Sequence, residues 1–428
     1  MSRLLPRLAI LAVLFFAATS HPAHAAAPAL QLRDDDVWVM AGDSITAQRL
    51  HTNYIEAFYR TRYPKLRLHF RNSGIGGNRA NGVLARFDYD VAAWKPTIVS
   101  VELGMNDVGG SEEAYITGMK ELIGRIRAIR AQPVLISSSP VDAGSAMGDW
   151  RSPRCEKLHL FTEALRKLAE EEKVVFIDQL HPIMELWTAN RRKPGIPKPP
   201  ATSPALPVAV AGATPAPPPP KPPVQPPLIP LGGDPVHPGE VGQYTMAAVI
   251  LAGLKAEGEV SSATLQADGK VIEAKRCQIT EATAKDGKLS FTRLDEASPW
   301  PIQPSAKTAL TLHPEILDLS RYTLRVTGLA DGPYRISING QAAGTVSAKE
   351  LAAGWNMTAA LDGFFGERAT ALLALIGTLQ SGLNTTWRAA SQTKDREKIA
   401  AAQKAIVECE AEIQAAVQPM PLRFDIEK

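Results

Sequence analysis

The stretch that decides the fold is VWVMAGDS at residues 37–44, an apolar run that ends in a small turn and a serine, Ser44. A short buried strand that runs into such a turn is typical of the way α/β hydrolytic enzymes lift a serine clear of the sheet edge. Residues 45–60 follow with helical spacing, so the N-terminal amides of a helix face the same point. A Gly-Asp turn whose serine only caps a helix explains the same residues, and partners elsewhere in the chain must decide between the two interpretations.

Short β-branched runs recur along the first half of the chain, with amphipathic stretches between them. The predicted strands are residues 37–41, 68–70, 98–103, 134–137 and 174–177. The predicted helices are residues 54–63, 83–94, 112–130 and 156–171. Strands buried on both faces that alternate with helices predict an α/β fold with a parallel sheet covered by helices. Reactive groups gather at the carboxyl ends of such strands, and Ser44 lies at one of them.

The second half of the chain changes character twice. Residues 194–230 hold 16 of the 34 prolines, a composition that neither pairs as a strand nor continues as a helix. Between 263 and 348, alternating runs separated by Asp-Gly and Asn-Gly turns predict a small antiparallel β region, and helical spacing returns after 364. The predicted organisation begins with an α/β domain over residues 33–256 that contains a proline-rich insertion at 194–230. A β-rich region over 257–350 and a helical tail over 360–428 follow it.

The first residues resemble an export signal more than part of the fold. Arg3 and Arg7 flank an apolar stretch, and the small-x-small pattern AHA at residues 23–25 predicts a secretory signal peptide over residues 1–25. An uncleaved membrane tether is the alternative, but the apolar stretch is too short for a permanent span. We therefore expect an exported protein, periplasmic or secreted, with no stable membrane span.

Charge and cysteine content narrow the class of protein further. The formal net charge is +3, and no long basic stripe offers a footprint for nucleic acid. Cys155, Cys277 and Cys409 are widely spaced and form no metal-ligand pair. An oxidising compartment would allow one disulfide and leave one thiol free, and the spacing does not say which residues pair.

Three further motifs carry polar groups to the neighbourhood of Ser44. Residues 72–78 (NSGIGGN) follow the second predicted strand, and their glycines let backbone N–H groups approach a ligand closely. Residues 104–107 (GMND) follow the third strand, where the Asn106 amide could donate to a developing oxyanion or cap the next helix. In residues 234–238 (DPVHP), an aspartate three positions before a histidine can orient its ring through Nδ1 and leave Nε2 as a base.

These motifs, with Gly42-Asp43-Ser44, resemble the four sequence blocks of the SGNH (GDSL-type) ester hydrolases, in that family's order. The resemblance covers residues 35–256 apart from the proline tract, and it implies a flavodoxin-like three-layer fold with strand order 2-1-3-4-5. It also implies Ser44 as nucleophile, His237 as general base and acid, and Asp234 as its orienting partner. The implied oxyanion donors are the backbone N–H groups of Ser44 and Gly77 and the side chain of Asn106. The family needs no metal and no organic cofactor.

A second Asp-x-x-His-Pro competes for the position of the base. Asp178 and His181 stand in residues 178–182 (DQLHP), directly after the fifth predicted strand. The residues after His237 resemble the family's last helix and those after His181 do not, which favours Asp234 and His237. The proline tract then becomes an exposed insertion near the rim of the active site, where typical members have a much shorter loop.

The resemblance implies hydrolysis of O-acyl esters through an acyl-enzyme, with carbohydrate O-acetyl groups as the first expectation for the substrate. A lysophospholipase or thioesterase would use the same residues, and a non-catalytic envelope or carbohydrate-binding protein could retain a degenerate hydrolase domain. Trp300 and Trp355 either line a sugar-binding surface or fill a core. The other histidines are expected to be ordinary residues without matched partners, namely His51, His69, His159 and His313.

Overall fold

The computed structural model describes residues 30–141, 152–191, 229–361 and 363–428. The predicted signal peptide lies outside these residues, and so does the proline-rich insertion apart from its last two positions. Within the described residues, no helix is long and apolar enough to cross a membrane.

A parallel sheet of five strands forms the centre of the α/β domain. Its strands are β1 (Val37–Gly42), β2 (His69–Gly74), β3 (Ile98–Glu102), β4 (Gln132–Ile136) and β5 (Val175–Ile177). They lie in the order β2-β1-β3-β4-β5, and every neighbouring pair is parallel. The predicted α/β class and strand order are therefore confirmed, and the strand positions agree to within a few residues.

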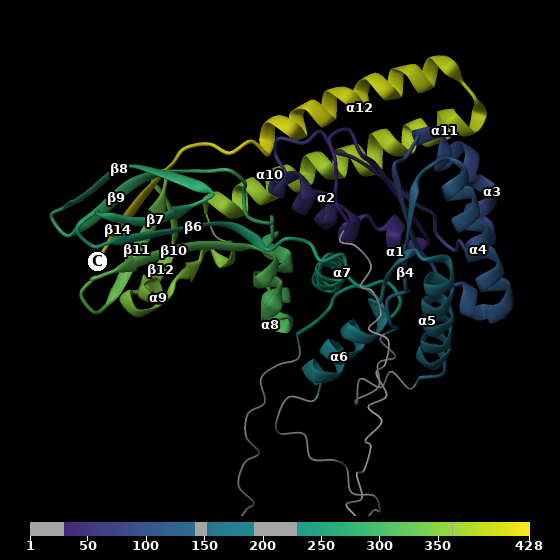
Figure 1. Ribbon diagram of the computed structural model, residues 1–428, viewed down its shortest axis with the longest axis horizontal. Helices are drawn as coiled ribbons and strands as arrows, with labels where there is room; N and C mark the ends of the chain where they lie inside the picture. The colour runs from purple at the N-terminus through teal and green to yellow at the C-terminus, as the bar shows by residue number, and fades with distance from the viewer. Residues whose placement is uncertain (1–29, 142–151, 192–228, 362) are drawn as a thin grey trace, which may run out of the picture.

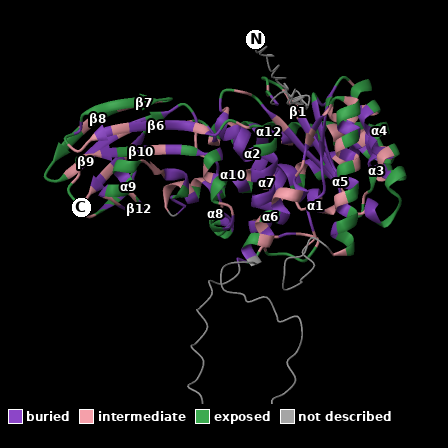
Figure 2. Ribbon diagram, turned by 60° about the horizontal axis from the view of Figure 1, so that its bottom comes forward, coloured by how far each residue is buried: buried purple, intermediate pink, exposed green. Residues whose placement is uncertain are grey.

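Helices cover both faces of this sheet (Figure 1). They are α1 (Ser44–Ala47), α2 (Leu50–Arg62), α3 (Ala80–Asp90), α4 (Glu112–Ala128), α5 (Pro153–Glu172), α6 (Leu180–Arg191) and α7 (Glu240–Gly253). Helix α4 illustrates why these segments are helical: Ser111 caps its first turn, and Tyr115, Met119, Leu122 and Ile126 repeat at the spacing of one buried face. Helix α7 is buried almost throughout, as Figure 2 shows in purple, because it packs against both α2 and α6.

The β-rich region consists of two sheets packed face to face. The first has the order β13-β10-β6-β7 and comprises β6 (Glu259–Gln266), β7 (Val271–Lys275), β10 (Arg321–Thr327) and β13 (Trp355–Asn356). The second has the order β12-β11-β14-β9-β8 and comprises β8 (Cys277–Lys285), β9 (Lys288–Asp295), β11 (Pro333–Ile338), β12 (Gln341–Ser347) and β14 (Leu422–Glu427). Apolar side chains from both sheets share one core cluster.

The predicted antiparallel β region is present, with one exception in the first sheet, where β10 pairs with β6 in parallel. Between β9 and β10 the chain forms α8 (Ala309–Leu312) and several short helical turns, and this long connection returns it in the same direction as β6. Turn signals in a sequence identify hairpins, but they carry no information about strands joined by such a crossover.

The C-terminal segment is helical for most of its length. It comprises α10 (Phe364–Gly377), the π-helical segment η6 (Thr378–Leu383), α11 (Asn384–Thr393) and α12 (Arg396–Ala416). The prediction of a helical tail over 360–428 is wrong at its end, because residues 422–427 form β14 in the middle of the second sheet. A single short alternation without a hairpin turn gives no sign of so distant a pairing.

The tail is also part of the core of the molecule. Figure 1 shows α10, α11 and α12 running from the β sandwich across the α/β domain, and α10 contacts both α2 and β12. Ile376 and Leu379 share a buried apolar cluster with Trp38 and Phe58 of the α/β domain. The tail and the α/β domain therefore form one continuous hydrophobic core.

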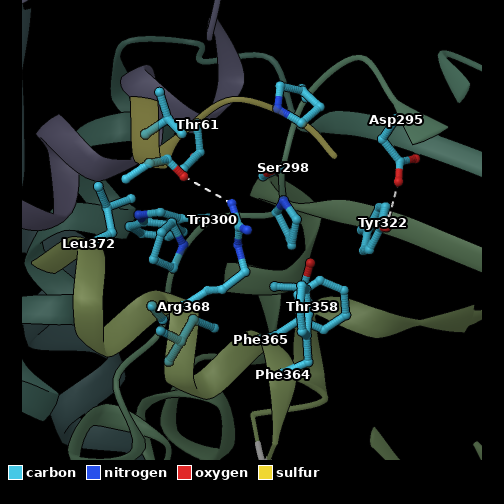
Figure 3. Close-up of a pocket in the computed structure, with 18 of the residues that line it drawn as sticks. Thr61, Asp295, Ser298, Trp300, Tyr322, Thr358, Phe364, Phe365, Arg368 and Leu372 are labelled. Carbon is cyan, nitrogen blue, oxygen red and sulfur yellow. Dashed lines mark hydrogen bonds between the residues drawn. The ribbon is translucent and has the colours of Figure 1, made fainter. Parts of the chain in front are cut away.

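A small cavity of about 60 Å³ marks the place where the three parts meet (Figure 3). Trp300 lies on its α/β side: it is 2% exposed, its ring stacks on Tyr244, and its indole N–H donates to the backbone oxygen of Tyr54 at 2.9 Å. Arg368 enters from α10 and donates to the backbone oxygen of Ala416. Trp300 is thus a core residue, and Trp355 is half-buried in β13.

Candidate active site

Ser44 is presented by the turn between β1 and α1. The Asp43 carboxylate accepts a hydrogen bond from the backbone N–H of Ile45 at 2.9 Å and so caps α1. Only glycine fits at position 42, because a Cβ there would lie 2.0 Å from Oγ1 of Thr46 and 2.9 Å from the backbone oxygen of Glu102. This close approach lets the strand turn sharply and leaves Ser44 half-buried at the sheet edge.

His237 reaches Ser44 from a loop far away in the sequence. Its Nε2 lies 2.8 Å from Oγ of Ser44, and its Nδ1 lies 2.9 Å from Oδ2 of Asp234. The loop closes through Gly233, whose φ is +74° and whose Cβ would collide with the backbone oxygen of His237 at 2.0 Å. A glycine is therefore required to place Asp234 and His237 side by side.

Asp234 is held in its ionised form. Hydrogen bonds from the His237 side chain, and from the backbone N–H groups of His237 and Val236, lower the pKa of Asp234 to about 2. A carboxylate that accepts the Nδ1 proton keeps the Nε2 lone pair directed at the serine. The arrangement is suited to removing a proton from a hydroxyl group.

The competing pair, Asp178 and His181, does not face the serine. Nδ1 of His181 lies 2.7 Å from Asp178, and Nε2 of His181 lies 2.8 Å from Nδ1 of His159. The structure brings His237, and not His181, against Ser44.

The segments that carry the expected oxyanion donors, Gly77 and Asn106, lie beside the serine turn. Gly76 is the neighbour of Ser44 in the glycine loop, since a Cβ on Gly76 would lie 3.9 Å from that of Ser44, and the adjacent Gly77 is exposed with φ +74°. The Asn106 amide donates to the backbone oxygen of Asn78 at 3.1 Å and makes a longer contact of 3.3 Å with Asp43. Asn106 thus joins the glycine loop to the serine turn, and its N–H groups are shared between these partners.

A buried ion pair supports the serine turn from below. Glu102 on β3 lies 2.8 Å from Nε2 of His51 and accepts hydrogen bonds from Thr46 at 3.0 Å and Gln179 at 2.7 Å. Burial opposes both charges, but the pairing outweighs it, so the pKa of His51 is raised and that of Glu102 is lowered. Burial, together with the charge of Glu102, raises the pKa of Asp43 to about 7.

The expectation that the remaining histidines lack partners is wrong. Besides His51 with Glu102, His69 lies 2.9 Å from Glu410, and His313 lies 2.9 Å from Glu315. One signal was available, because a carboxylate inside a buried strand, such as Glu102, requires a partner.

The helical tail completes the hydrogen bonding of β2, the edge strand that leads into the glycine loop. The Gln380 amide accepts from the backbone N–H of Asn72 at 2.9 Å and donates to the backbone oxygen of Phe70 at 2.9 Å. Arg388 donates to the backbone oxygen of Asn72 at 2.7 Å. Side chains of the tail therefore occupy the place of a sixth strand.

The same contacts reach the serine turn. The Asn72 side chain donates to the backbone oxygen of Thr46 in α1 at 2.7 Å, and Arg49 donates to the backbone oxygen of Gln380 at 3.1 Å. Nothing in the sequence motifs indicated these roles for Gln380 and Arg388.

Both the sequence and the fold of this chain are similar to those of known proteins. Residues 40–197 match the GDSL-like lipase/acylhydrolase family. The acetylxylan esterase of Geobacillus stearothermophilus is 24% identical over 132 residues, which are 29% of this chain and 60% of that protein. The chain therefore spans less than two thirds of this curated relative.

Similarity was also found to two solved structures, to very different extents. The gut microbial diltiazem-metabolizing enzyme BT4096 is similar with a TM-score of 0.73 and 20% identity, over 93% of this chain and 98% of that one. The acetylxylan esterase Axe2 of Geobacillus stearothermophilus is similar with a TM-score of 0.38 and 19% identity, over 52% of this chain and 94% of that one. The first likeness extends through the β sandwich and the tail, so these parts belong to a recurring fold.

The matched span contains Ser44, Gly77 and Asn106 but ends before Asp234 and His237. The position of the histidine against the serine therefore rests on the geometry alone. The match of residues 40–197 to the GDSL-like lipase/acylhydrolase family confirms the resemblance that the sequence motifs carry.

Proposed function

We propose that this protein is a carboxylic ester hydrolase in which Ser44 is the nucleophile, His237 the general base and acid, and Asp234 the residue that orients His237. One observation carries the proposal: Nε2 of His237 lies 2.8 Å from the Ser44 hydroxyl while its Nδ1 is held by Asp234. Ser44 lies near the beginning of the α/β domain's sequence, and Asp234 and His237 lie near its end. Their alignment in space has no evident structural purpose.

The mechanism follows from these positions. His237 accepts the Ser44 proton as the hydroxyl oxygen attacks the ester carbonyl. The resulting oxyanion accepts hydrogen bonds from the backbone N–H groups of Ser44 and Gly77 and from the Asn106 amide, which gives up its longer 3.3 Å contact with Asp43. Each donor contributes about 3–4 kcal/mol to lowering the barrier. His237 then protonates the leaving alcohol, and water hydrolyses the acyl-enzyme through the same groups.

O-acetyl groups on a carbohydrate are the proposed substrate class. The acetylxylan esterase among the relatives supports this choice, and so does the exposure of Gly76, Gly77 and Asp234 around the serine, which lets a bulky alcohol portion approach. We further propose that the protein acts outside the cytoplasm, since residues 1–25 carry the pattern of a cleaved export signal. Cell fractionation and N-terminal sequencing of the mature protein test that part.

The activity is tested with a series of p-nitrophenyl esters from acetate to octanoate and with acetylated xylan. We expect acetate release from xylan and a preference for the shortest ester, whereas a preference for long chains would indicate a lipid acyl hydrolase. A fluorophosphonate should label the wild type at Ser44 and leave Ser44→Ala unlabelled. Absence of both labelling and hydrolysis would indicate a binding protein with a degenerate site.

A further inference from the structure

The pair that competed for the catalytic base has a different use in the structure. His159 and Glu163 stand one turn apart on α5 and so face the same way, and His181 stands in the first turn of α6. Nδ1 of His159 lies 2.8 Å from Nε2 of His181, and one ligand atom from each of the three residues lies within 4.8 Å of the others. Two imidazoles and a carboxylate therefore converge on one point between two helices.

The His181 ring is oriented as a metal-ligating ring would be. Asp178 lies 2.7 Å from Nδ1 of His181 and also accepts from the backbone N–H of His181 at 3.2 Å. Arg166 donates to the same carboxylate oxygen, Oδ2 of Asp178. A carboxylate on Nδ1 fixes the tautomer and turns the Nε2 lone pair outward, which is the outer-shell arrangement common around protein-bound zinc.

Solvent reaches the convergence point through a cavity of about 470 Å³ that His159 and His181 line together with Cys155 and Met184. A hydrated ion can enter by this route, and water can complete its coordination. The ligand set also selects the ion, because imidazole nitrogen suits zinc and related transition metals and is a poor ligand for Mg²⁺ or Ca²⁺.

We propose that His159, Glu163 and His181 bind one zinc ion that ties α5 to α6, with water in the remaining position and Asp178 as the positioning residue for His181. Arg166 lies 3.4 Å from Glu163, so the carboxylate exchanges this exposed contact for the metal. The Asp-x-x-His motif at 178–181 then serves the metal, and the ester-hydrolysing groups are untouched. The proposal does not depend on the proposed function.

The test uses the full chain, stripped with a chelator and titrated with Zn²⁺ by calorimetry and by thermal unfolding. We expect one zinc per chain and a rise in Tm of about 3 °C or more at saturation. His159→Ala and His181→Ala should each weaken zinc binding at least 100-fold, and Asp178→Asn should weaken it about 10-fold. His313→Ala, which alters another histidine beside a carboxylate, is the matched control and should bind as the wild type does.

Cobalt gives a second readout that does not require the alanine variants to fold. Co²⁺ bound to this ligand set should show visible absorption in the wild type, and Glu163→Gln should change its intensity without changing the Tm of the metal-free protein. Hydrolysis of p-nitrophenyl acetate should be the same with and without zinc. Binding at less than one zinc per chain, or unchanged binding in His159→Ala, would overturn the proposal.

Discussion

The two sides of the candidate active site are held in very different ways. On the nucleophile side, Asp43, Asn72 and Glu102 are buried, and contacts from β3, α2 and the tail converge on them. On the acid–base side, the Asp234 side chain is 60% exposed, and the hydrogen bonds it accepts come from its own loop. The nucleophile side is therefore stabilised by the fold as a whole, whereas the position of the base depends on one local turn.

The largest expected effect comes from removing the base. His237→Ala should lower kcat for p-nitrophenyl acetate by about 10⁴-fold or more, while Tm changes by no more than about 1 °C because the loop is exposed. Ester hydrolysis rates and thermal unfolding measure the two effects. His181→Ala is the matched control and should retain most of the activity; the reverse result would move the base to His181.

A substitution on the nucleophile side, by contrast, should mainly lower the stability of the protein. His51→Asn leaves Glu102 buried without its partner and should destabilise the protein by about 3–5 kcal/mol. The raised pKa of His51 stabilises the folded protein at pH values below the pKa of His51 in the unfolded chain, and this stability is lost as pH rises through the folded pKa. The lowered pKa of Glu102 stabilises it at pH values above the pKa of Glu102 in the unfolded chain, and this stability is lost as pH falls through the folded pKa. The difference between variant and wild type, from urea unfolding, should therefore be largest near pH 5–6. A difference that grew steadily towards pH 9 would contradict this pairing.

Asp234→Asn tests how much the exposed side depends on its own carboxylate. We expect a fall in kcat of about 10⁴-fold, because an amide can orient the His237 ring but favours the wrong tautomer. Since the pKa of Asp234 is lowered to about 2, this group stays ionised as pH falls towards that value. If kcat of the wild type falls below some pH above 4, the same fall should therefore appear in Asp234→Asn. Its disappearance in the variant would show that the titrating group is Asp234.

The smallest expected effect links the tail to the nucleophile side. Gln380→Leu leaves the backbone N–H of Asn72 and the backbone oxygen of Phe70 without their partners, at a cost of about 2 kcal/mol. We expect kcat to fall about tenfold with KM nearly unchanged, because the glycine loop after β2 loses its support. Ser381→Ala, at an exposed position of the same π-helical segment, is the control. Unchanged kcat in Gln380→Leu would reduce the tail to a purely structural part.

The sequence predicted those features of the structure that depend on short motifs. Five apolar runs were enough to place the strands. Two Asp-x-x-His pairs had the same spacing, and the residues after His237, which resemble the family's last helix, favoured the histidine that the structure sets beside Ser44. The sequence did not predict the Gln380 contacts with β2, because one glutamine in a helix looks the same whether it faces solvent or a strand edge. The parallel pairing of β6 with β10 was missed for a related reason, since pairing across a long crossover leaves no local pattern.

The position of β14 has a consequence for the order in which the protein is made. Ser290 on β9 donates to Asp425 on β14, and the two residues are 135 positions apart in sequence. At translation rates of about 5–20 residues per second, β9 waits on the order of ten seconds for this neighbour to be synthesised. During that time β9 and β11 both present unpaired edges where β14 will insert. We therefore expect the β sandwich to be the last part of the nascent chain to fold and the part most in need of a chaperone.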